Sequence, residues 1–257
     1  MLKFDANLTF LFRELPLPER FAAARAAGFS GVELLITEGA SADALRRAAR
    51  EAGIEVVLCN APMGDFLAGG LGLSGAPGRE NEFAGAIKEA AALAVSLSCS
   101  RIHVGPSRLE DGASRATALA VLRKNLLMAA EVLGEAGVEA LVEPLNTNDF
   151  PDALLYDPDE CAAIIEDIDV ENLKLQYDVY HMSQMQPSIV SAFCRHIERI
   201  GHVQFADAPG RGAPGSGQID FLAFFEAVEK SGYQGWLGAE FNPGENPAPF
   251  AWLERYQ

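Results

Sequence analysis

The chain has 257 residues, a length that suits one large α/β domain. Hydrophobic residues make up 49% and charged residues 22% of the chain, a globular composition that excludes general disorder. Asp and Glu number 36 against 20 Lys and Arg, giving a formal net charge of −16. Because clustered Lys and Arg hold phosphate groups, this balance argues against nucleic acid and anionic membranes as partners.

Cysteine usage and hydropathy predict a cytoplasmic protein. No apolar run approaches the roughly 18 residues that a transmembrane helix needs. The N-terminus has an acidic residue, Asp5, and no long apolar core, so it does not resemble a secretory signal. The cysteines form no Cys-x-x-Cys pair and are expected to be reduced core thiols. They are Cys59, Cys99, Cys161 and Cys194.

Short apolar runs alternate with longer amphipathic stretches along the chain, and no linker interrupts the pattern. Eight runs predict strands: Lys3–Asn7, Gly31–Leu35, Glu55–Asn60, Arg101–Val104, Glu139–Glu143, Leu173–Asp178, Gly201–Phe205 and Gly235–Glu240. Helices are predicted at Ala42–Ala52, Glu80–Leu97, Ser114–Ala136 and after Asp220, where apolar residues recur every three or four positions or a capping residue leads. A short last helix is predicted within Pro247–Tyr256.

Eight strand–helix units in about 250 residues predict a single (β/α)8 TIM barrel spanning residues 1–257. A doubly wound open sheet is the alternative, since it alternates in the same way. Strand polarity favours the barrel. In Leu173–Asp178 one face is apolar, whereas Lys174, Gln176 and Asp178 make the other face polar. A sheet between two helix layers is apolar on both faces, so polar side chains here are expected inside a barrel.

The active site of such a barrel lies at the C-terminal ends of its strands. Four successive predicted strands end in oxygen-bearing side chains: Glu143, Asp178, Gln204 and Glu240. Carboxylate and amide oxygens are ligands that Mg²⁺ or Mn²⁺ prefers. Each residue alone also fits a loop acid or a helix cap, but that explanation weakens when four consecutive strands share the pattern.

The segments around these positions resemble one known family. They include FDANLTFLF, NAPMGDF, EPLN, QYDVYHMSQMQ, GHVQFADAPGRGAPGSGQIDF and GYQGWLGAEF. The chain is similar over essentially its whole length to hydroxypyruvate isomerases, members of the xylose isomerase-like TIM barrels. The resemblance implies an aldose–ketose type isomerase with a divalent metal, Mg²⁺ or Mn²⁺, and no nucleotide cofactor. It also implies a small hydroxy-oxo acid substrate, a place in glyoxylate metabolism and room for a homo-oligomer.

The resemblance also assigns residues. It implies that Glu143, Asp178, Gln204 and Glu240 bind the metal and that Glu143 and Glu240 transfer the proton. Related ketose epimerases usually have His where this chain has Gln204. By the same matching, substrate contacts fall on His181, Arg211 and Asp149. Without a ligand, His181 also fits a histidine bonded to backbone at a helix start, and Arg211 fits a solvated loop arginine.

The chemistry of the residues agrees with that assignment. Isomerising an α-hydroxy carbonyl through an enediolate needs a base, an acid and positive charge at the oxygens. A substrate carboxylate needs a cationic anchor, which the guanidinium of Arg211 can provide. The alternatives are a four-carbon 2-oxo acid isomerase or a ketose 3-epimerase on the same scaffold, a metal-dependent endonuclease, and a non-catalytic binding barrel. Few histidines and the acidic charge disfavour the endonuclease.

Weaker signals surround this set. Loop Ala61–Gly78 contains a G-x-G-x-x-G pattern, but it lies too far from its strand for dinucleotide binding, and we predict a flexible rim loop or lid. Asn60 and Asp65 border the loop and either face the substrate or shape the loop. Asn7, Glu33 and His103 either line the site or are polar filler of the barrel. The apolar cluster of Phe10, Leu11 and Phe12 is either a pocket wall or a subunit contact, and Trp236 and Trp252 are predicted to be packing aromatics.

Overall fold

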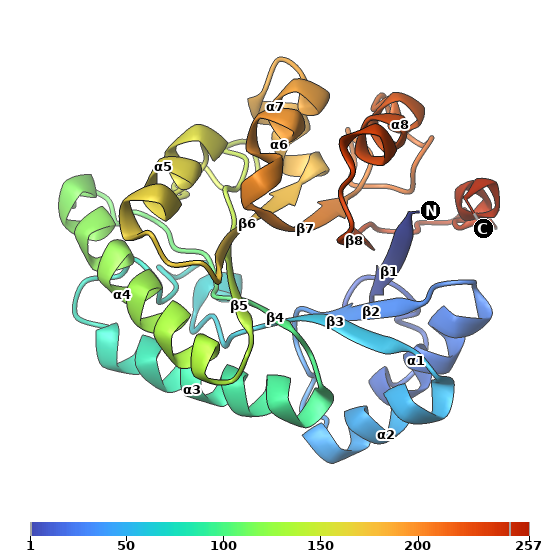
Figure 1. Ribbon diagram of the computed structural model, residues 1–257, viewed down its shortest axis with the longest axis horizontal. Coiled ribbons are helices and arrows are strands. Elements are labelled where there is room, and N and C mark those ends of the chain that lie inside the picture. Colours follow the sequence, from blue (N-terminus) through green and yellow to red (C-terminus); the bar gives the residue numbers. More distant parts are fainter. Residues whose placement is uncertain (1, 247, 257) are drawn as a thin grey trace. The chain divides into compact units, whose positions relative to one another are not determined.

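A computed structural model describes residues 2–246 and 248–256. Its eight strands follow one another in chain order around a closed parallel barrel (Figure 1). They are β1 Lys3–Asn7, β2 Gly31–Leu34, β3 Glu55–Asn60, β4 Arg101–His103, β5 Glu139–Val142, β6 Leu173–Asp178, β7 Ile200–Phe205 and β8 Trp236–Ala239. The predicted TIM barrel is confirmed, and the open-sheet alternative is wrong.

Helices occupy the connections between the strands. The α-helices are α1 Leu17–Ala26, α2 Ala42–Ala52, α3 Glu80–Leu97, α4 Arg115–Glu135, α5 Pro158–Ile168, α6 Val179–Met185, α7 Ile189–His196 and α8 Phe221–Ser231. Short 3-10 turns are η1 Phe66–Ala68, η2 Ile197–Arg199 and η3 Ala251–Arg255. The predicted caps are present, since the side chain of Ser41 accepts a hydrogen bond from the amide of Ala44 and that of Asp220 from Ala223.

The predicted short C-terminal helix is present as the 3-10 helix η3. Pro247 lies outside the described residues. Trp252 in this turn packs edge-on against Phe4 and Phe205, with ring centroids 5.2 and 5.3 Å apart, as expected of a packing aromatic.

The chain divides into two compact units. The first comprises Met1–Leu58, Asp178–Glu198 and His202–Gln257. In it β1 pairs in parallel with β2 and with β8, and β7 pairs with β8. Asp5 and Asn7 on β1 are opposite Gly31 and Glu33 on β2, so polar side chains of neighbouring strands come side by side.

The second unit comprises Cys59–Tyr177 and Arg199–Gly201. Here β3 pairs with β4, β4 with β5 and β5 with β6, and α3 packs on α4 (Figure 1). Three of the cysteines are buried as expected, but Cys194 in the first unit is exposed. The expectation for Cys194 fails because it lies on the outward side of α7, whose buried residues are Ala192, Phe193 and His196.

Hydrogen bonds and a cation–π contact hold loop Ala61–Gly78 at several points. Arg79 donates hydrogen bonds to Asp65 and to the carbonyl of Gly72, at 2.7 and 2.9 Å. The hydroxyl of Ser107 accepts a hydrogen bond from the amide of Gly75 at 2.7 Å. Arg108 lies over the Phe66 ring at 4.0 Å and donates to two loop carbonyls. Asp65 therefore shapes the loop.

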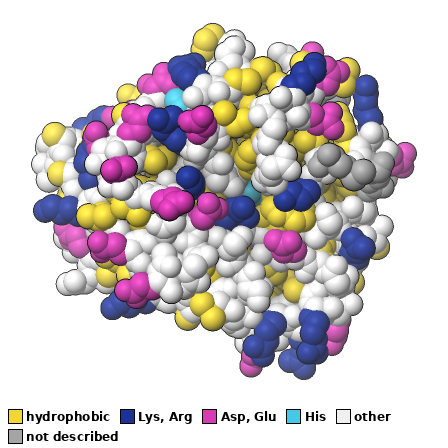
Figure 2. All heavy atoms as spheres, in the orientation of Figure 1, with side chains coloured by type: hydrophobic (Ala, Val, Ile, Leu, Met, Phe, Trp, Pro, Cys, Tyr) yellow, Lys and Arg dark blue, Asp and Glu magenta, His cyan; other side chains and the backbone are white. Residues whose placement is uncertain are grey.

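The surface is charged, and no membrane span was found. Among the described residues, no helix is both long and apolar enough to cross a bilayer. On the face drawn in Figure 2, carboxylates and basic side chains are interspersed, without a broad area of one sign.

Candidate active site

Two side-chain amides connect two glutamates at the strand ends of the first unit. Asn7 Nδ2 donates hydrogen bonds to Glu33 Oε1 and to Glu240 Oε2, both at 2.9 Å. Gln204 Nε2 donates to the same two oxygens, at 2.7 and 2.5 Å. All four side chains are buried. Glu33 Oε1 and Glu240 Oε2 both act as acceptors here, so the nitrogen of each amide is directed toward the glutamates.

Glu240 directly follows β8 and combines burial with charged neighbours. Burial raises the pKa of the Glu240 carboxyl to about 8, and the nearby Glu33 and Asp178 carboxylates add to the rise. The Arg211 guanidinium and the hydrogen bond from Asn7 oppose it. Arg211 Nη2 pairs with Glu240 Oε1. A carboxyl with a raised pKa can give and take a proton near neutral pH, which suits an acid–base group.

Arg211 is held between aromatic rings in the loop after β7. Its guanidinium lies 5.0 Å from the ring centres of both Phe10 and Tyr180, and its Nη2 is 3.5 Å from Asp178 Oδ2. Its side chain is 18% exposed, so the interpretation as a solvated loop arginine is wrong. Phe10 contacts this arginine, which favours its interpretation as a wall of the site.

A buried aspartate builds the loop that carries Arg211. Asp207 Oδ2 accepts hydrogen bonds from the amides of Gly215 and Gly217, at 2.9 and 2.8 Å. Its Oδ1 accepts from the amides of Ala208 and Ile219, at 2.9 and 3.0 Å. The loop backbone in turn holds Arg211, whose carbonyl accepts from Asn242 at 2.8 Å. The Asp207 carboxylate thus accepts hydrogen bonds from four backbone amides and fixes the backbone from which the Arg211 side chain extends.

Asp178 and His181 lie at the junction of β6 and α6. Asp178 caps the helix, because its Oδ1 accepts a hydrogen bond from the amide of Tyr180 at 2.8 Å. His181, one turn along, is buried, with Nε2 3.5 Å from Asp178 Oδ2. Its ring is therefore beside a carboxylate. Five of the eight predicted site residues are thus in the first unit: Asp178, His181, Gln204, Arg211 and Glu240.

The other three predicted residues belong to the second unit. Glu143 directly follows β5 and accepts a hydrogen bond from Gln176 Nε2 at 3.2 Å, and His103 Nε2 lies 3.6 Å from the same carboxylate oxygen. Asn60 ends β3 with Nδ2 3.0 Å from His103 Nδ1. If Asn60 donates this bond, His103 presents Nε2–H toward Glu143. Asp149 is exposed in the loop after β5 and hydrogen-bonds Asn146.

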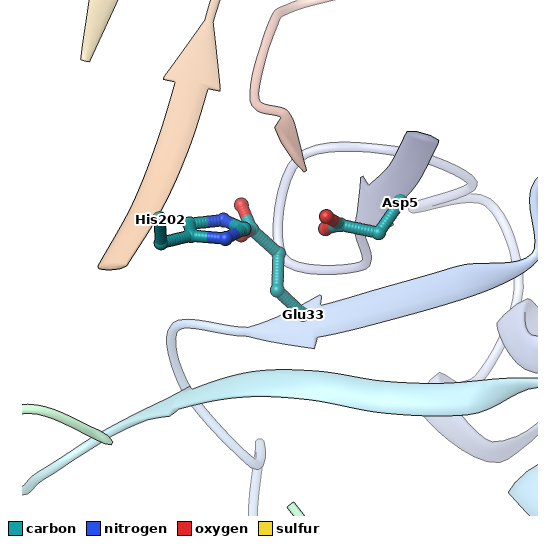
Figure 3. A group of neighbouring side chains, drawn as sticks. All are labelled: Asp5, Glu33 and His202. Carbon is teal, nitrogen blue, oxygen red and sulfur yellow. The ribbon is translucent and has the colours of Figure 1, made fainter. Parts of the chain in front are cut away.

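Carboxylate and imidazole groups of the first unit can also hold a cation. Asp5, Glu33 and His202 are fully buried, and each offers a donor atom within 4.8 Å of the others. Figure 3 shows the carboxylates of Asp5 on β1 and Glu33 on β2 directed toward the ring of His202 on β7. Among the strand-end residues, the Glu240 carboxyl is held near Asp178 in a buried place where its charge is disfavoured. A divalent cation would stabilise carboxylate oxygens in such surroundings.

Some buried polar residues were not singled out by the sequence analysis. They include Asp5 and His202, which lie beside Glu33, and Asp207, which accepts hydrogen bonds from four loop amides. Asp5 and His202 stand two positions before Asn7 and Gln204, so they occupy the same strand face. The alternation of side chains along a strand is enough to predict that they share this face. The role of Asp207 depends on a loop conformation that parity does not give.

The comparisons place the chain in a family. A family model described as xylose isomerase-like TIM barrel matches residues 21–256. The putative hydroxypyruvate isomerase of Mus musculus is 39% identical, covering 99% of this chain and 95% of the relative. The 2-oxo-tetronate isomerase of Cupriavidus necator is 37% identical, with 100% and 99% covered. A crystal structure described as AP endonuclease, family 2, from Brucella melitensis has a TM-score of 0.95 and 33% identity, with both chains fully covered.

The chain belongs to the xylose isomerase-like TIM barrel family. Its resemblance to hydroxypyruvate isomerases is confirmed, since several curated relatives carry that name over nearly their full length. These relatives are isomerases by name, which agrees with the predicted enzyme class.

Proposed function

We propose that the protein interconverts hydroxypyruvate and 2-hydroxy-3-oxopropanoate (tartronate semialdehyde). The observation that carries the proposal is the buried Glu240 carboxyl, whose pKa is raised to about 8 and which is paired with Arg211. A carboxyl suited to proton transfer thus lies beside a guanidinium that could bind a carboxylate, which supports the proposal. The names of the full-length relatives support the same reaction.

In the proposed reaction a proton leaves C3 of hydroxypyruvate, and C2 gains one through an enediolate. The hydroxyl hydrogen passes from the C3 oxygen to the C2 oxygen, so atoms balance. One of Glu143 and Glu240 takes the C3 proton and the other delivers the C2 proton. Glu240 is suited to holding a proton near neutral pH, because burial disfavours its charge.

We propose that Glu143, Asp178, Gln204 and Glu240 hold a divalent cation, Mg²⁺ or Mn²⁺. When bound, such an ion stabilises the negative charge that develops on the enediolate oxygens. Gln204 directs its nitrogen at Glu33 and Glu240, so only its Oε1 can serve as the ligand atom. No nucleotide cofactor is required by this chemistry.

Substrate contacts are proposed for Arg211, His181, Asn60 and Asp149. Arg211 is the anchor for the substrate carboxylate, because its guanidinium is positioned by two rings and presents N–H groups to oxygen acceptors. His181 is placed to hydrogen-bond a substrate oxygen from α6. Asn60 acts at least through His103, to which its amide is bonded. Asp149 rests on the family resemblance.

A four-carbon 2-oxo acid is the second candidate substrate. The observation that favours it is the 2-oxo-tetronate isomerase at 37% identity, nearly as similar as the hydroxypyruvate isomerases. One added carbon changes binding by about 1–3 kcal/mol, so the same site chemistry serves either acid. A ketose 3-epimerase is a weaker candidate, because a neutral sugar has no carboxylate for Arg211.

We propose a cytoplasmic enzyme that acts on small acids, without nucleic acid or membrane partners, and that can form a homo-oligomer. The formal charge of −16 opposes binding to polyanions. Fluorescence anisotropy with abasic duplex DNA tests this directly at about 0.15 M salt. Saturable binding there would instead support the endonuclease reading that the Brucella melitensis structure's description raises.

The deciding experiment is NMR of the purified protein in D₂O with hydroxypyruvate and Mg²⁺, repeated with Mn²⁺. We expect tartronate semialdehyde together with enzyme-dependent deuterium at C3. A parallel sample with 2-oxo-tetronate measures the second candidate. Faster turnover of the four-carbon acid would reassign the substrate, and no turnover or exchange with either acid would reject the proposed reaction.

A further inference from the structure

Glu33 is a buried glutamate on β2 that the proposed reaction does not use. Its Oε1 accepts hydrogen bonds from Asn7 Nδ2 and Gln204 Nε2, at 2.9 and 2.7 Å. Each of these nitrogens donates its second hydrogen to Glu240 Oε2. An amide NH₂ has two hydrogens, so Asn7 and Gln204 spend both on the two glutamates. The orientation of both amides toward Glu240 therefore depends on Glu33, the acceptor on their other side.

His202 contacts the second carboxylate oxygen of Glu33. Its Nε2 lies 2.8 Å from Glu33 Oε2, and both side chains are at most 1% exposed. Nδ1 of His202 has no hydrogen-bond partner among residues 2–246 and 248–256. The tautomer with its hydrogen on Nε2 fits both facts, because it donates to Glu33 and leaves no buried N–H without an acceptor.

Gly238 on β8 has no side chain, and this makes room for the side chains of Glu33 and His202. A Cβ atom at position 238 would lie 2.6 Å from Glu33 Oε2 and 2.9 Å from His202 Nε2, closer than real Cβ contacts allow. A side chain here would force the pair apart. Three strands thus contribute to one contact, with Glu33 on β2, His202 on β7 and the bare backbone of β8.

We propose that Glu33 is a positioning residue for Glu240, acting through the amides of Asn7 and Gln204. It keeps one N–H of each amide directed at the Glu240 carboxyl, and His202 fixes Glu33 in turn. This inference rests on the proposed function, in which Glu240 transfers a proton. It gives the Asp5, Glu33 and His202 group a hydrogen-bonding role, because the facing atoms of Glu33 and His202 are already bonded to each other.

Three variants test the proposal. Glu33→Leu removes the acceptor, and we expect kcat to fall about 100-fold with KM changed less than about threefold, since substrate anchoring is separate. Glu33→Gln keeps an oxygen for both amides, so its kcat should stay within about tenfold of wild type. Gly238→Ala retains every hydrogen-bonding group but separates the pair, and it should lower kcat in the same direction as Glu33→Leu.

A second readout does not depend on turnover. Solvent exchange of the Asn7 and Gln204 side-chain amides, followed by NMR with selectively ¹⁵N-labelled Asn and Gln, should speed up about tenfold in Glu33→Leu but little in Glu33→Gln. Asn172→Ala is the matched control for lost stability. Asn172 belongs to the second unit, and its side-chain amide donates hydrogen bonds to the backbone carbonyls of Ala130 and Val138 in that same unit.

The possible outcomes distinguish a failure of the proposed isomerase function from a failure of the positioning role of Glu33. A wild-type protein without turnover rejects the proposed function, while amide exchange still decides whether Glu33 holds the two amides. Active Glu33→Leu with wild-type kcat, or unchanged amide exchange in that variant, overturns the positioning role. An equal fall of kcat in Asn172→Ala would likewise overturn it, since general destabilisation would then account for the loss.

Discussion

The Glu240 carboxyl is buried beside the carboxylates of Glu33 and Asp178, and it also has a guanidinium and two amide donors within reach. Burial is the largest of these influences and raises its pKa to about 8. The hydrogen bonds fix the position of the carboxyl, while burial sets its readiness to keep a proton. Arg211 and Asn7, which help to position the carboxyl, lower its pKa but do not cancel the effect of burial.

This raised pKa predicts how stability depends on pH. In the unfolded chain the Glu240 carboxyl loses its proton near pH 4.5, whereas the folded protein keeps it up to about 8. The folded state binds more protons in that window, so the free energy of unfolding should fall as pH rises from about 4.5 to about 8. Each unit of the pKa rise corresponds to about 1.4 kcal/mol. Thermal unfolding of chelator-treated protein measures the slope.

Glu240→Gln is the comparison for that measurement, because glutamine has no carboxyl to titrate. The variant should lose part of the fall in unfolding free energy between about pH 4.5 and 8. Superimposable pH curves for the variant and wild type would show that Glu240 does not carry the effect.

Replacing either proposed proton-transfer glutamate should lower turnover. We expect Glu143→Gln and Glu240→Gln each to reduce kcat by at least about 100-fold, since a positioned acid or base contributes 10²–10⁴-fold. Glu139→Gln is a matched control from β5, the strand that Glu143 follows, and Glu139 pairs with Arg101 at 3.2 Å. Steady-state kinetics decide the matter, and near wild-type turnover in either site variant would rule out the two-carboxylate reaction.

At the scale of elements, the loop after β7 depends on one carboxylate. Asp207→Asn replaces an acceptor oxygen with an NH₂ group, so two of the four loop amides lose their acceptor. Each buried amide without an acceptor costs about 1–3 kcal/mol. Because this loop carries Arg211, we expect KM to rise about tenfold or more, with a smaller change in kcat.

Kinetics and backbone hydrogen exchange over residues 208–219 measure the effect of Asp207→Asn. Asp220→Ala is the control from the same loop, because Asp220 caps α8 through the amide of Ala223. It should cost about 1 kcal/mol of stability and leave KM unchanged. A KM that rises equally in both variants would indicate that the loop is sensitive to any destabilisation.

The elements themselves follow closely from local sequence. Helices α3 and α2 have the predicted bounds, and α2 is delimited by the Ser41 cap and the left-handed Gly53. The loops were harder to predict. The conformation of Ala61–Gly78 depends on Arg79, Ser107 and Arg108, which are distant in sequence from many of their contacts. Loop composition rich in Gly indicates freedom of the backbone, but it does not indicate what holds it.

The site shows the same division at the level of single residues. The positions of Glu143, Asp178, Gln204 and Glu240 at or next to strand ends were predictable, because the strands follow one another in chain order around the barrel. The hydrogen-bond partners of these residues were not predictable. Gln204 donates to two glutamates that are 171 and 36 residues away along the chain, and only the folded structure brings them together.

At the scale of the whole molecule, a divalent cation should stabilise the fold. A ligand that binds only the folded state at 100 times its Kd adds about 2.7 kcal/mol. For a chain of this size we expect Mn²⁺ or Mg²⁺ to raise Tm by several degrees, at about 2–4 °C per kcal/mol. Scanning calorimetry with added metal and with EDTA measures this.

Asp178→Asn should abolish most of that rise, because it removes one of the proposed anionic ligands. Addition of the metal to a Glu139→Gln control should still raise Tm. Equal Tm values for wild-type protein with metal and with EDTA would contradict a resident cation.

The paired amides that connect Glu33 and Glu240 also constrain protein engineering. A ketose epimerase usually has His at the position of Gln204, so Gln204→His is the obvious first step toward a sugar substrate. An imidazole nitrogen carries at most one hydrogen, and it cannot replace an NH₂ group that donates to both glutamates at once. Redesign of this barrel for sugars therefore has to change positions 33 and 204 together.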